Sequence, residues 1–245
     1  MENAMMVALS RQITLRRELS ITANNLANMS TAGFKVEKML LASNPGKSAN
    51  HTDGPAKINF VQGWGVSRNF SDGRIEMTNR PMDMALVGPG FFVIETEQGE
   101  KYTRDGRFDV DETGTLVSAD GNPVLDDTNS PILLDAFGSS PEISKNGTVF
   151  VAGAEVARLK VVQFPQLGQL SKDGSGRYSA APDAEQTVIE NPRIMQGFLE
   201  RSNVVPILEI SKMIEVTRAY KSVTNMLKSQ EDNSKDAIKR LGRVR

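Results

Sequence analysis

Residues 3–28, NAMMVALSRQITLRRELSITANNLAN, contain the pattern that decides how the whole chain is interpreted. Mostly apolar side chains recur there at alternating steps of three and four residues, namely Met5, Ala8, Gln12, Leu15, Leu19, Thr22 and Leu26. This spacing places one narrow stripe on a helix, which is typical of a coiled-coil seam rather than of a broad core-facing side. We predict a helix from about Asn3 to Asn28, and Gly33 stops any continuation.

The other end of the chain repeats the pattern over residues 210–241, ISKMIEVTRAYKSVTNMLKSQEDNSKDAIKRL. Its stripe comprises Ile210, Met213, Thr217, Tyr220, Thr224, Leu227, Ser234, Ile238 and Leu241, interrupted by Glu231. We predict a second helix from near Val204 to about Leu241, with Asn203 as its cap and Pro206 in its first turn. Because two narrow stripes are buried only against each other or against a neighbour, we expect the chain ends to pair.

The middle of the chain carries β signals from about residue 60 to residue 199. Five Asp-Gly or Asn-Gly pairs punctuate it, at 72–73, 105–106, 120–121, 146–147 and 173–174. These dipeptides tolerate the positive φ angles of tight hairpin turns, so we expect an antiparallel arrangement. The predicted fold is a mixed α and β protein, with a central antiparallel β domain flanked by long N- and C-terminal amphipathic, coiled-coil-like helices. The predicted segments are 1–42 (N-terminal helix and turn), 43–59 (flexible loop), 60–200 (β-rich domain) and 201–245 (C-terminal helix).

Composition excludes several classes of function. The net charge of −1 disfavours a nucleic acid as the main partner. The chain has no cysteine, which removes disulfide scaffolds and the usual zinc and thiol chemistry. No apolar run approaches about 20 residues, so no membrane insertion is expected. No basic-then-apolar leader precedes the first helix, and by ordinary rules the protein would be cytoplasmic unless a machine that uses no cleaved leader exports it.

Catalytic and metal-binding patterns are weak. His51 is the only histidine and lies in a loop rich in Gly, Pro and Asn, which disfavours a histidine base. Gly88-Pro89-Gly90 lacks the third glycine of a dinucleotide loop and indicates a turn that enters a strand. The run from Asp109 to Gly114 resembles a calcium loop, but Asp120 replaces the bidentate glutamate and an acidic hairpin tip fits better. We therefore predict no catalytic, metal or cofactor residue, and no enzyme.

Short motifs near both ends resemble those of the flagellar rod and hook proteins. NNLAN at 24–28 and TAGFK at 31–35 resemble that family's N-terminal signature, and LERSNV at 199–204 and MIEVTRAY at 213–220 its C-terminal one. PMDMALVGPGFFV at 81–93 and YTRDG at 102–106 resemble its β-domain core. Matches in this order cover most of the chain. The length and the opening MENA resemble the proximal rod members most, with the distal rod and hook-type axial members as alternatives.

The resemblance implies a structural subunit of the bacterial flagellar basal-body rod. Such subunits pass through the flagellar type III export apparatus without a cleaved signal peptide and stack in the periplasmic space with copies of themselves and with other rod proteins. The paired helices would form an inner tube and the β domain would lie outside it. We expect the subunit interface to contain Leu15, Leu19, Asn24, Asn25, Leu26, Asn28, Gly33, Phe34, Ser202, Asn203, Val204, Ile210, Met213, Ile214, Arg218, Tyr220 and Leu227.

Two other classes of function remain open from the residues alone. A secreted cell-wall glycan hydrolase with helical docking arms would need two carboxylates facing across a cleft, drawn from Asp109, Asp111, Asp126 and Asp127. A cytoplasmic homodimeric binding module would instead bury the helical stripes in a closed bundle.

Overall fold

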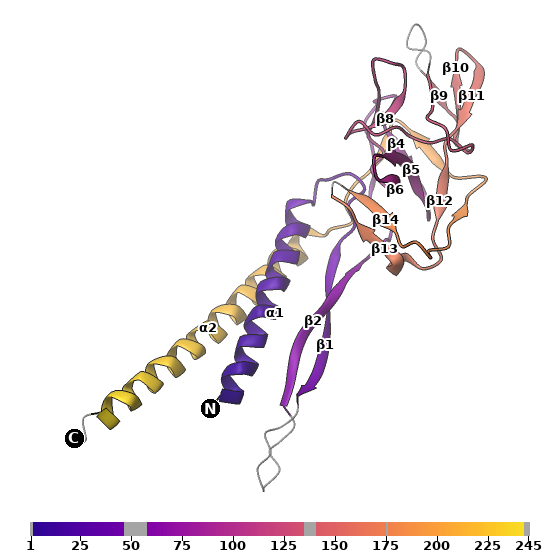
Figure 1. Cartoon of the computed structure of the whole chain (residues 1–245). Helices are drawn as coiled ribbons and strands as arrows, with labels where there is room; N and C mark the ends of the chain where they lie inside the picture. The colour runs from indigo at the N-terminus through magenta and orange to yellow at the C-terminus, as the bar shows by residue number, and fades with distance from the viewer. Residues whose placement is uncertain (1, 47–57, 135–140, 175, 243–245) are drawn as a thin grey trace. The chain divides into compact units, whose positions relative to one another are not determined.

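The computed structural model describes residues 2–46, 58–134, 141–174 and 176–242 (Figure 1). The chain forms two compact units. The first consists of Met1–Ala27, Glu37–Arg68 and Val205–Arg245, and the second of Asn28–Val36 and Asn69–Val204. Each unit is assembled from stretches that lie far apart in the sequence, whereas the segments expected from the sequence are contiguous.

Two antiparallel helices dominate the first unit. Helix α1 spans Glu2–Ala27 and helix α2 spans Pro206–Gly242. They pack against each other, with the Gln12 side chain donating to Thr224 Oγ1 (3.0 Å) and Lys212 lying 3.4 Å from Glu18. The structure therefore confirms both helices and the pairing of the chain ends. Pro206 is the first residue of α2, where its missing N–H costs no helical hydrogen bond.

A long β-hairpin completes the first unit. Strand β1 (Glu37–Gly46) pairs antiparallel with β2 (Ile58–Arg68), from Glu37 opposite Arg68 to Gly46 opposite Ile58. Helix α1 lies between this hairpin and α2 (Figure 1). The sequence predicts a flexible loop over 43–59. That prediction is wrong for 43–46 and 58–59, because cross-strand pairing orders them; residues 47–57, which include His51, lie outside the described residues.

A six-stranded sheet forms the centre of the second unit, with the strand order β13-β14-β6-β5-β12-β15. A short 3₁₀ helix, η1 (Leu167–Gln169), precedes β13. The strands are β5 (Phe91–Thr96), β6 (Gly99–Thr103), β12 (Val161–Gln163), β13 (Leu170–Lys172), β14 (Arg177–Ala180) and β15 (Thr187–Val188).

The second unit also contains several smaller sheets. Strands β9 (Glu142–Ile143), β10 (Thr148–Val151) and β11 (Ala154–Arg158) form a three-stranded sheet. The two-stranded pairs are β3 (Ile75–Met77) with β17 (Phe198–Glu200), β4 (Met84–Leu86) with β16 (Ile194–Gln196), and β7 (Phe108–Val110) with β8 (Leu116–Ser118). All strand pairs among the described residues are antiparallel, as the turn pattern predicted.

Strand β5 separates two hydrophobic cores. Phe92 and Ile94 belong to one core, and Phe91 and Val93 belong to the other. Because successive side chains of a strand point to opposite faces, a continuous apolar run indicates a strand that is covered on both sides. The run Gly90-Phe-Phe-Val-Ile94 therefore lies at the middle of the unit, and Gly90, with φ +132°, leads into it as the predicted strand-entering turn.

The five Asx-Gly pairs serve two different purposes. Gly121, Gly147 and Gly174 have the predicted positive φ angles and lie in tight turns. Gly73 and Gly106 do not have positive φ, so the prediction of hairpin turns at 72–73 and 105–106 is wrong. Instead, a Cβ at Gly106 would lie 1.6 Å from Met84 O, so glycine is required there by close backbone approach.

Candidate assembly interface

The 3–4 stripe faces inward within the first unit. On α1, Ala8, Leu15 and Thr22 are buried and Leu19 and Leu26 are half-buried. On α2, the half-buried members are Met213, Thr217, Tyr220, Thr224, Leu227 and Ser234, whereas Met5, Ile210 and Ile238 of the two stripes are exposed. The chain itself therefore covers most of the surface that the sequence analysis assigned to neighbouring subunits.

A second apolar face on each helix is exposed, and most of its residues are not among those predicted from the sequence to form the stripes or the subunit interface. It consists of Met6, Leu9 and Ile13 on α1, and of Ile207, Leu208, Ile210 and Ile214 on α2. The exposed fraction is 53% for Ile13 and 66% for Ile207, although both side chains are large and apolar. On α1 this face follows the same spacing as the stripe, one residue further along, which is the signal that could have found it. Contiguous exposed apolar surface of this kind marks an interaction site.

Asn25 joins α1 to the start of β1. Its Nδ2 donates to the Glu37 carbonyl oxygen (2.8 Å), and its Oδ1 accepts from the Glu37 N–H (2.9 Å). The same Nδ2 lies 3.1 Å from a carboxylate oxygen of Glu209 on α2. Because Asn25 is buried, an amide with both a donor and an acceptor is required at this position. Asn25 thus links the end of α1 to the start of β1 and to Glu209 of α2.

A buried ionic cluster in the second unit brings together three of the sequence motifs. Lys35 Nζ lies 2.5 Å from Glu200 Oε1, and Arg104 lies 3.3 Å from Glu200 Oε2. The side chains of Lys35 and Glu200 are 1% exposed and that of Arg104 is 3% exposed. Lys35 also donates to the Ser71 carbonyl, and Glu200 accepts from the Gly73 N–H (2.7 Å). Each charge is thereby both paired and hydrogen-bonded, as a buried ion requires.

Burial dominates the electrostatics of this cluster. It lowers the pKa of Lys35 below the ordinary value, although the Glu200 carboxylate and its hydrogen bond act in the opposite direction. Desolvation disfavours the ammonium form, and the nearby Arg104 adds repulsion. Removing one member would therefore leave a buried charge without its partner, which is costly.

The surroundings of Lys35 explain why position 33 is a glycine and position 203 is an asparagine. Gly33 has φ +67°, and a Cβ there would lie 2.4 Å from the Arg104 carbonyl carbon. Asn203 Oδ1 accepts from the Val36 N–H (2.7 Å), and Asn203 Nδ2 donates to the carbonyls of Asn69 and Ser71. The prediction that Asn203 caps the second helix is wrong, because its side-chain amide is used inside the second unit.

The structure places the predicted interface residues in three groups. Those buried within their own unit are Leu15, Asn25, Gly33, Phe34, Ser202 and Val204; those half-buried are Leu19, Asn24, Leu26, Asn28, Asn203, Met213, Tyr220 and Leu227. Those exposed are Ile210, Ile214 and Arg218. Within the chain, the ionic partner of Glu18 is Lys212, at 3.4 Å.

The carboxylates considered for glycan hydrolysis have structural contacts of their own. Asp111 Oδ1 accepts from the N–H groups of Thr113 and Thr115, and Asp126 Oδ1 accepts from those of Thr128 and Ser130. Each aspartate thus closes its own turn, and the run from Asp109 forms the acidic β7–β8 hairpin tip. Among the described residues, no group of three or more His, Cys, Asp or Glu side chains is arranged to hold a metal ion. None of the described helices is long and apolar enough to cross a membrane.

Comparison with known proteins gives matches at the start, the middle and the end of the chain. Residues 5–35 match the model of the flagella basal body rod protein, and residues 85–151 match the flagellar hook protein FlgE/F/G D1 domain. Residues 195–240 match the flagellar basal body rod FlgEFG protein C-terminal model.

Full-length relatives agree with these matches. The flagellar basal-body rod protein FlgF of Caulobacter vibrioides is 41% identical over 244 residues, which cover 100% of both chains. FlgF of Mesorhizobium japonicum is 32% identical over 248 residues, covering 99% of each chain. The rod protein FlgG of Bacillus subtilis is 28% identical over 237 residues, covering 88% of this chain and 90% of its own.

The matches at the start, the middle and the end of the chain define its class, the flagellar rod and hook proteins. Within that class, the chain belongs to the family of flagellar basal-body rod proteins and is similar over its whole length to members named FlgF. The family consists of structural components of the flagellar basal body, which confirms the resemblance drawn from the sequence motifs.

Proposed function

We propose that the chain is a rod subunit that polymerises through the helices of its first unit and helps to form the periplasm-spanning shaft of the flagellum. The observation that carries this proposal is the exposed apolar face on α1 and α2. An ordinary helix pair buries its apolar side chains, whereas Leu9, Ile13, Ile207 and Ile214 remain accessible here.

Neighbouring copies would cover these faces. Burying one large aliphatic side chain contributes about 1.5–3 kcal/mol, so a few such residues per helix offset a substantial part of the cost of association. In this arrangement the coiled-coil-like 3–4 stripe holds α1 and α2 together within a subunit. The second face then joins that pair to the pairs of adjacent subunits and forms the inner tube, with the β unit outside it.

The predicted interface residues take different roles in this proposal. Ile210, Ile214 and Arg218 contact neighbours directly because they are exposed. Leu15, Asn25, Gly33, Phe34 and Val204 act by fixing the shape of their own unit. The partners are copies of this chain and other flagellar rod proteins, and the route to the periplasmic rod is the flagellar type III export apparatus, without a cleaved leader.

Single aspartate substitutions on the exposed face test the proposal. Ile13→Asp and Ile214→Asp change side chains that water already reaches, so we expect wild-type circular dichroism and thermal unfolding from purified protein. Both variants should fail to enter isolated basal bodies and should abolish swimming, because a buried unpaired carboxylate is costly in the assembled rod. Ser222→Asp, at an exposed polar position of α2, is the matched control and should swim normally. Normal swimming of both isoleucine variants would contradict the proposal.

A further inference from the structure

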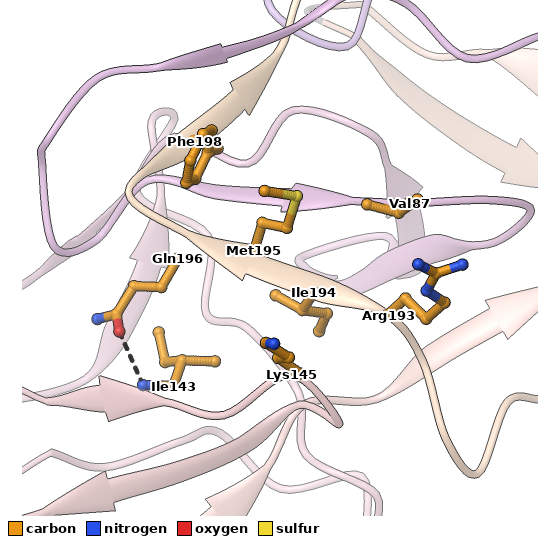
Figure 2. A pocket seen from close by; sticks show the side chains of 8 residues that line it. All are labelled: Val87, Ile143, Lys145, Arg193, Ile194, Met195, Gln196 and Phe198. Atoms are coloured by element: carbon orange, nitrogen blue, oxygen red, sulfur yellow. Dashed lines mark hydrogen bonds between the residues drawn. The ribbon is translucent and has the colours of Figure 1, made fainter.

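An open groove lies on the second unit, around β16. It has a volume of about 430 Å³, and β16 contributes Met195 and Gln196 to its lining (Figure 2). Val87, Ile143 and Phe198 supply further apolar surface. Gln196 fixes the wall, because its Oε1 accepts from the Ile143 N–H (3.0 Å) and its Nε2 donates to the carbonyls of Pro81 and Pro141. These three hydrogen bonds hold the Gln196 side chain in place at the wall of the groove.

Two cations line the groove, and neither has an acidic partner among the described residues. Lys145 and Arg193 are exposed, and neither forms an ion pair with the described part of the chain. In contrast, Lys35, Lys101 and Lys160 of the same unit are each paired with a carboxylate. Residues 41–203 contain 15 Lys and Arg against 22 Asp and Glu, a net charge of −7. A positively charged apolar groove is thus an exception on a negatively charged part of the chain.

The β7–β8 hairpin tip carries the opposite charge to the groove. Asp111 and Glu112 are exposed there, and the hydrogen bonds of Asp111 Oδ1 to the Thr113 and Thr115 N–H groups (2.9 and 2.8 Å) fix the turn. Leu133 lies beside the tip, because the next residue, Leu134, donates to the Gly114 carbonyl. Ile132 and Leu134 are buried in the core, so strand alternation turns Leu133 outward, and it is 62% exposed.

We infer that the groove is a contact between copies of this chain, which receives the β7–β8 tip of a second copy. Leu133 of that copy enters the apolar part beside Met195 and Phe198, and its Glu112 faces Lys145 and Arg193. Burial of apolar surface then provides the affinity. The charges fix the position of the tip in the groove and disfavour other partners. This inference rests on the proposed function, since a rod brings many copies together. Each copy carries both surfaces, so the contact can repeat from one copy to the next.

Cysteine trapping tests the contact in assembled rods. The chain has no cysteine, so a Met195→Cys/Leu133→Cys double variant introduces the only thiols. Oxidation of basal bodies from motile cells should give covalently linked multimers of the subunit. Each single variant should give none, and neither should Met195→Cys/Leu167→Cys, in which Leu167 is exposed but lies on η1, outside the groove lining. Motile cells whose double variant yields no more linked species than these controls would overturn the groove contact while leaving the proposed function intact. Absence of the unsubstituted chain from basal bodies would overturn the proposed function itself.

Charge reversal provides an independent test in solution. With purified full-length protein, Lys145→Glu/Arg193→Glu should weaken concentration-dependent self-association measured by sedimentation roughly five- to tenfold, and Glu112→Lys should weaken it similarly. Combining Lys145→Glu with Glu112→Lys in one chain should restore much of the loss. Arg74→Glu is the matched control at an exposed arginine and should have little effect. Equal behaviour of the groove, tip and control variants would overturn the inference.

Discussion

Lys35 and Glu200 form a buried ion pair across 165 residues of sequence, with Lys35 Nζ 2.5 Å from Glu200 Oε1. The pair links the end of the N-terminal motif to the start of the C-terminal one, and Arg104 from the middle of the chain completes it. Two segments that the sequence analysis assigned to subunit contacts thus have a demonstrable role inside a single β unit.

The buried pair should be energetically coupled. Lys35→Met leaves Glu200 with Arg104 as its remaining ionic partner, and we expect it to lower the free energy of unfolding by about 3–5 kcal/mol. Glu200→Gln should also destabilise, because Lys35 is then buried without a carboxylate. The double variant should lose clearly less than the sum of the two, as measured by urea unfolding of the four proteins. Strict additivity would show that the two side chains do not interact.

The stability of the protein should depend on the two hydrogen bonds between the Asn25 side-chain amide and the Glu37 backbone. Asn25→Asp removes the donor to the Glu37 carbonyl and places a carboxylate near Glu209, so we expect a loss of about 2–3 kcal/mol. Hydrogen exchange at the Glu37 amide should accelerate in parallel. Asn233→Asp makes the same chemical change at an exposed site of α2 and should leave both quantities near wild type. An unchanged rate of hydrogen exchange at the Glu37 amide in Asn25→Asp would show that these two hydrogen bonds do not hold the start of β1.

The turn between β10 and β11 contains correctable backbone strain. Ala152 has φ +51° and is followed by Gly153 with φ +81°, the pattern of a two-residue hairpin loop that favours Asn-Gly. Ala152→Asn should therefore raise the free energy of unfolding by about 0.5–1 kcal/mol. Gly153→Ala should lower it by about 1 kcal/mol, since it imposes the same strain on the second position. Thermal unfolding of the two variants should shift in opposite directions; a destabilised Ala152→Asn would contradict this explanation.

Acid unfolding should depend on the pair formed by Lys101 and Asp173. The hydrogen bond from Lys101, at 2.9 Å, holds the pKa of Asp173 below its ordinary value of 3.8. The unfolded chain then binds more protons between the two pKa values, so stability rises with pH in that window. The contribution is complete above pH 3.8 and is lost as the pH falls through the lower pKa of the folded state.

Asp173→Asn should flatten the acid limb of the plot of unfolding free energy against pH, and Lys101→Met should flatten it in the same way. Urea unfolding at a series of pH values below neutrality measures this slope. A slope identical to that of the unsubstituted protein would show that the pair does not contribute to acid sensitivity.

Some features could be predicted from local sequence because they depend on neighbouring residues. The 3–4 periodicity gave both helices to within two residues, with α1 at Glu2–Ala27 and α2 at Pro206–Gly242. The β1–β2 hairpin was not predicted over 37–46, because its strands are ordered by pairing with each other and by α1. Likewise, nothing local distinguishes the Asx-Gly pair at 105–106, where a distant carbonyl excludes a side chain, from the true turns at 146–147 and 173–174.

The sequence by itself determined the helices, the antiparallel β region, the pairing of the chain ends and the family. Periodicity and short motifs can be recognised from neighbouring residues alone, without knowing which distant residues are in contact. Only the tertiary structure decided which face of each helix is free. Leu15 and Ile13 are both apolar residues of α1, yet one is buried and the other is 53% exposed. Helical spacing sets which side chains share a face, but whether that face is covered depends on what packs against it. In this chain, α2 and the β1–β2 hairpin pack against α1 but leave Met6, Leu9 and Ile13 accessible.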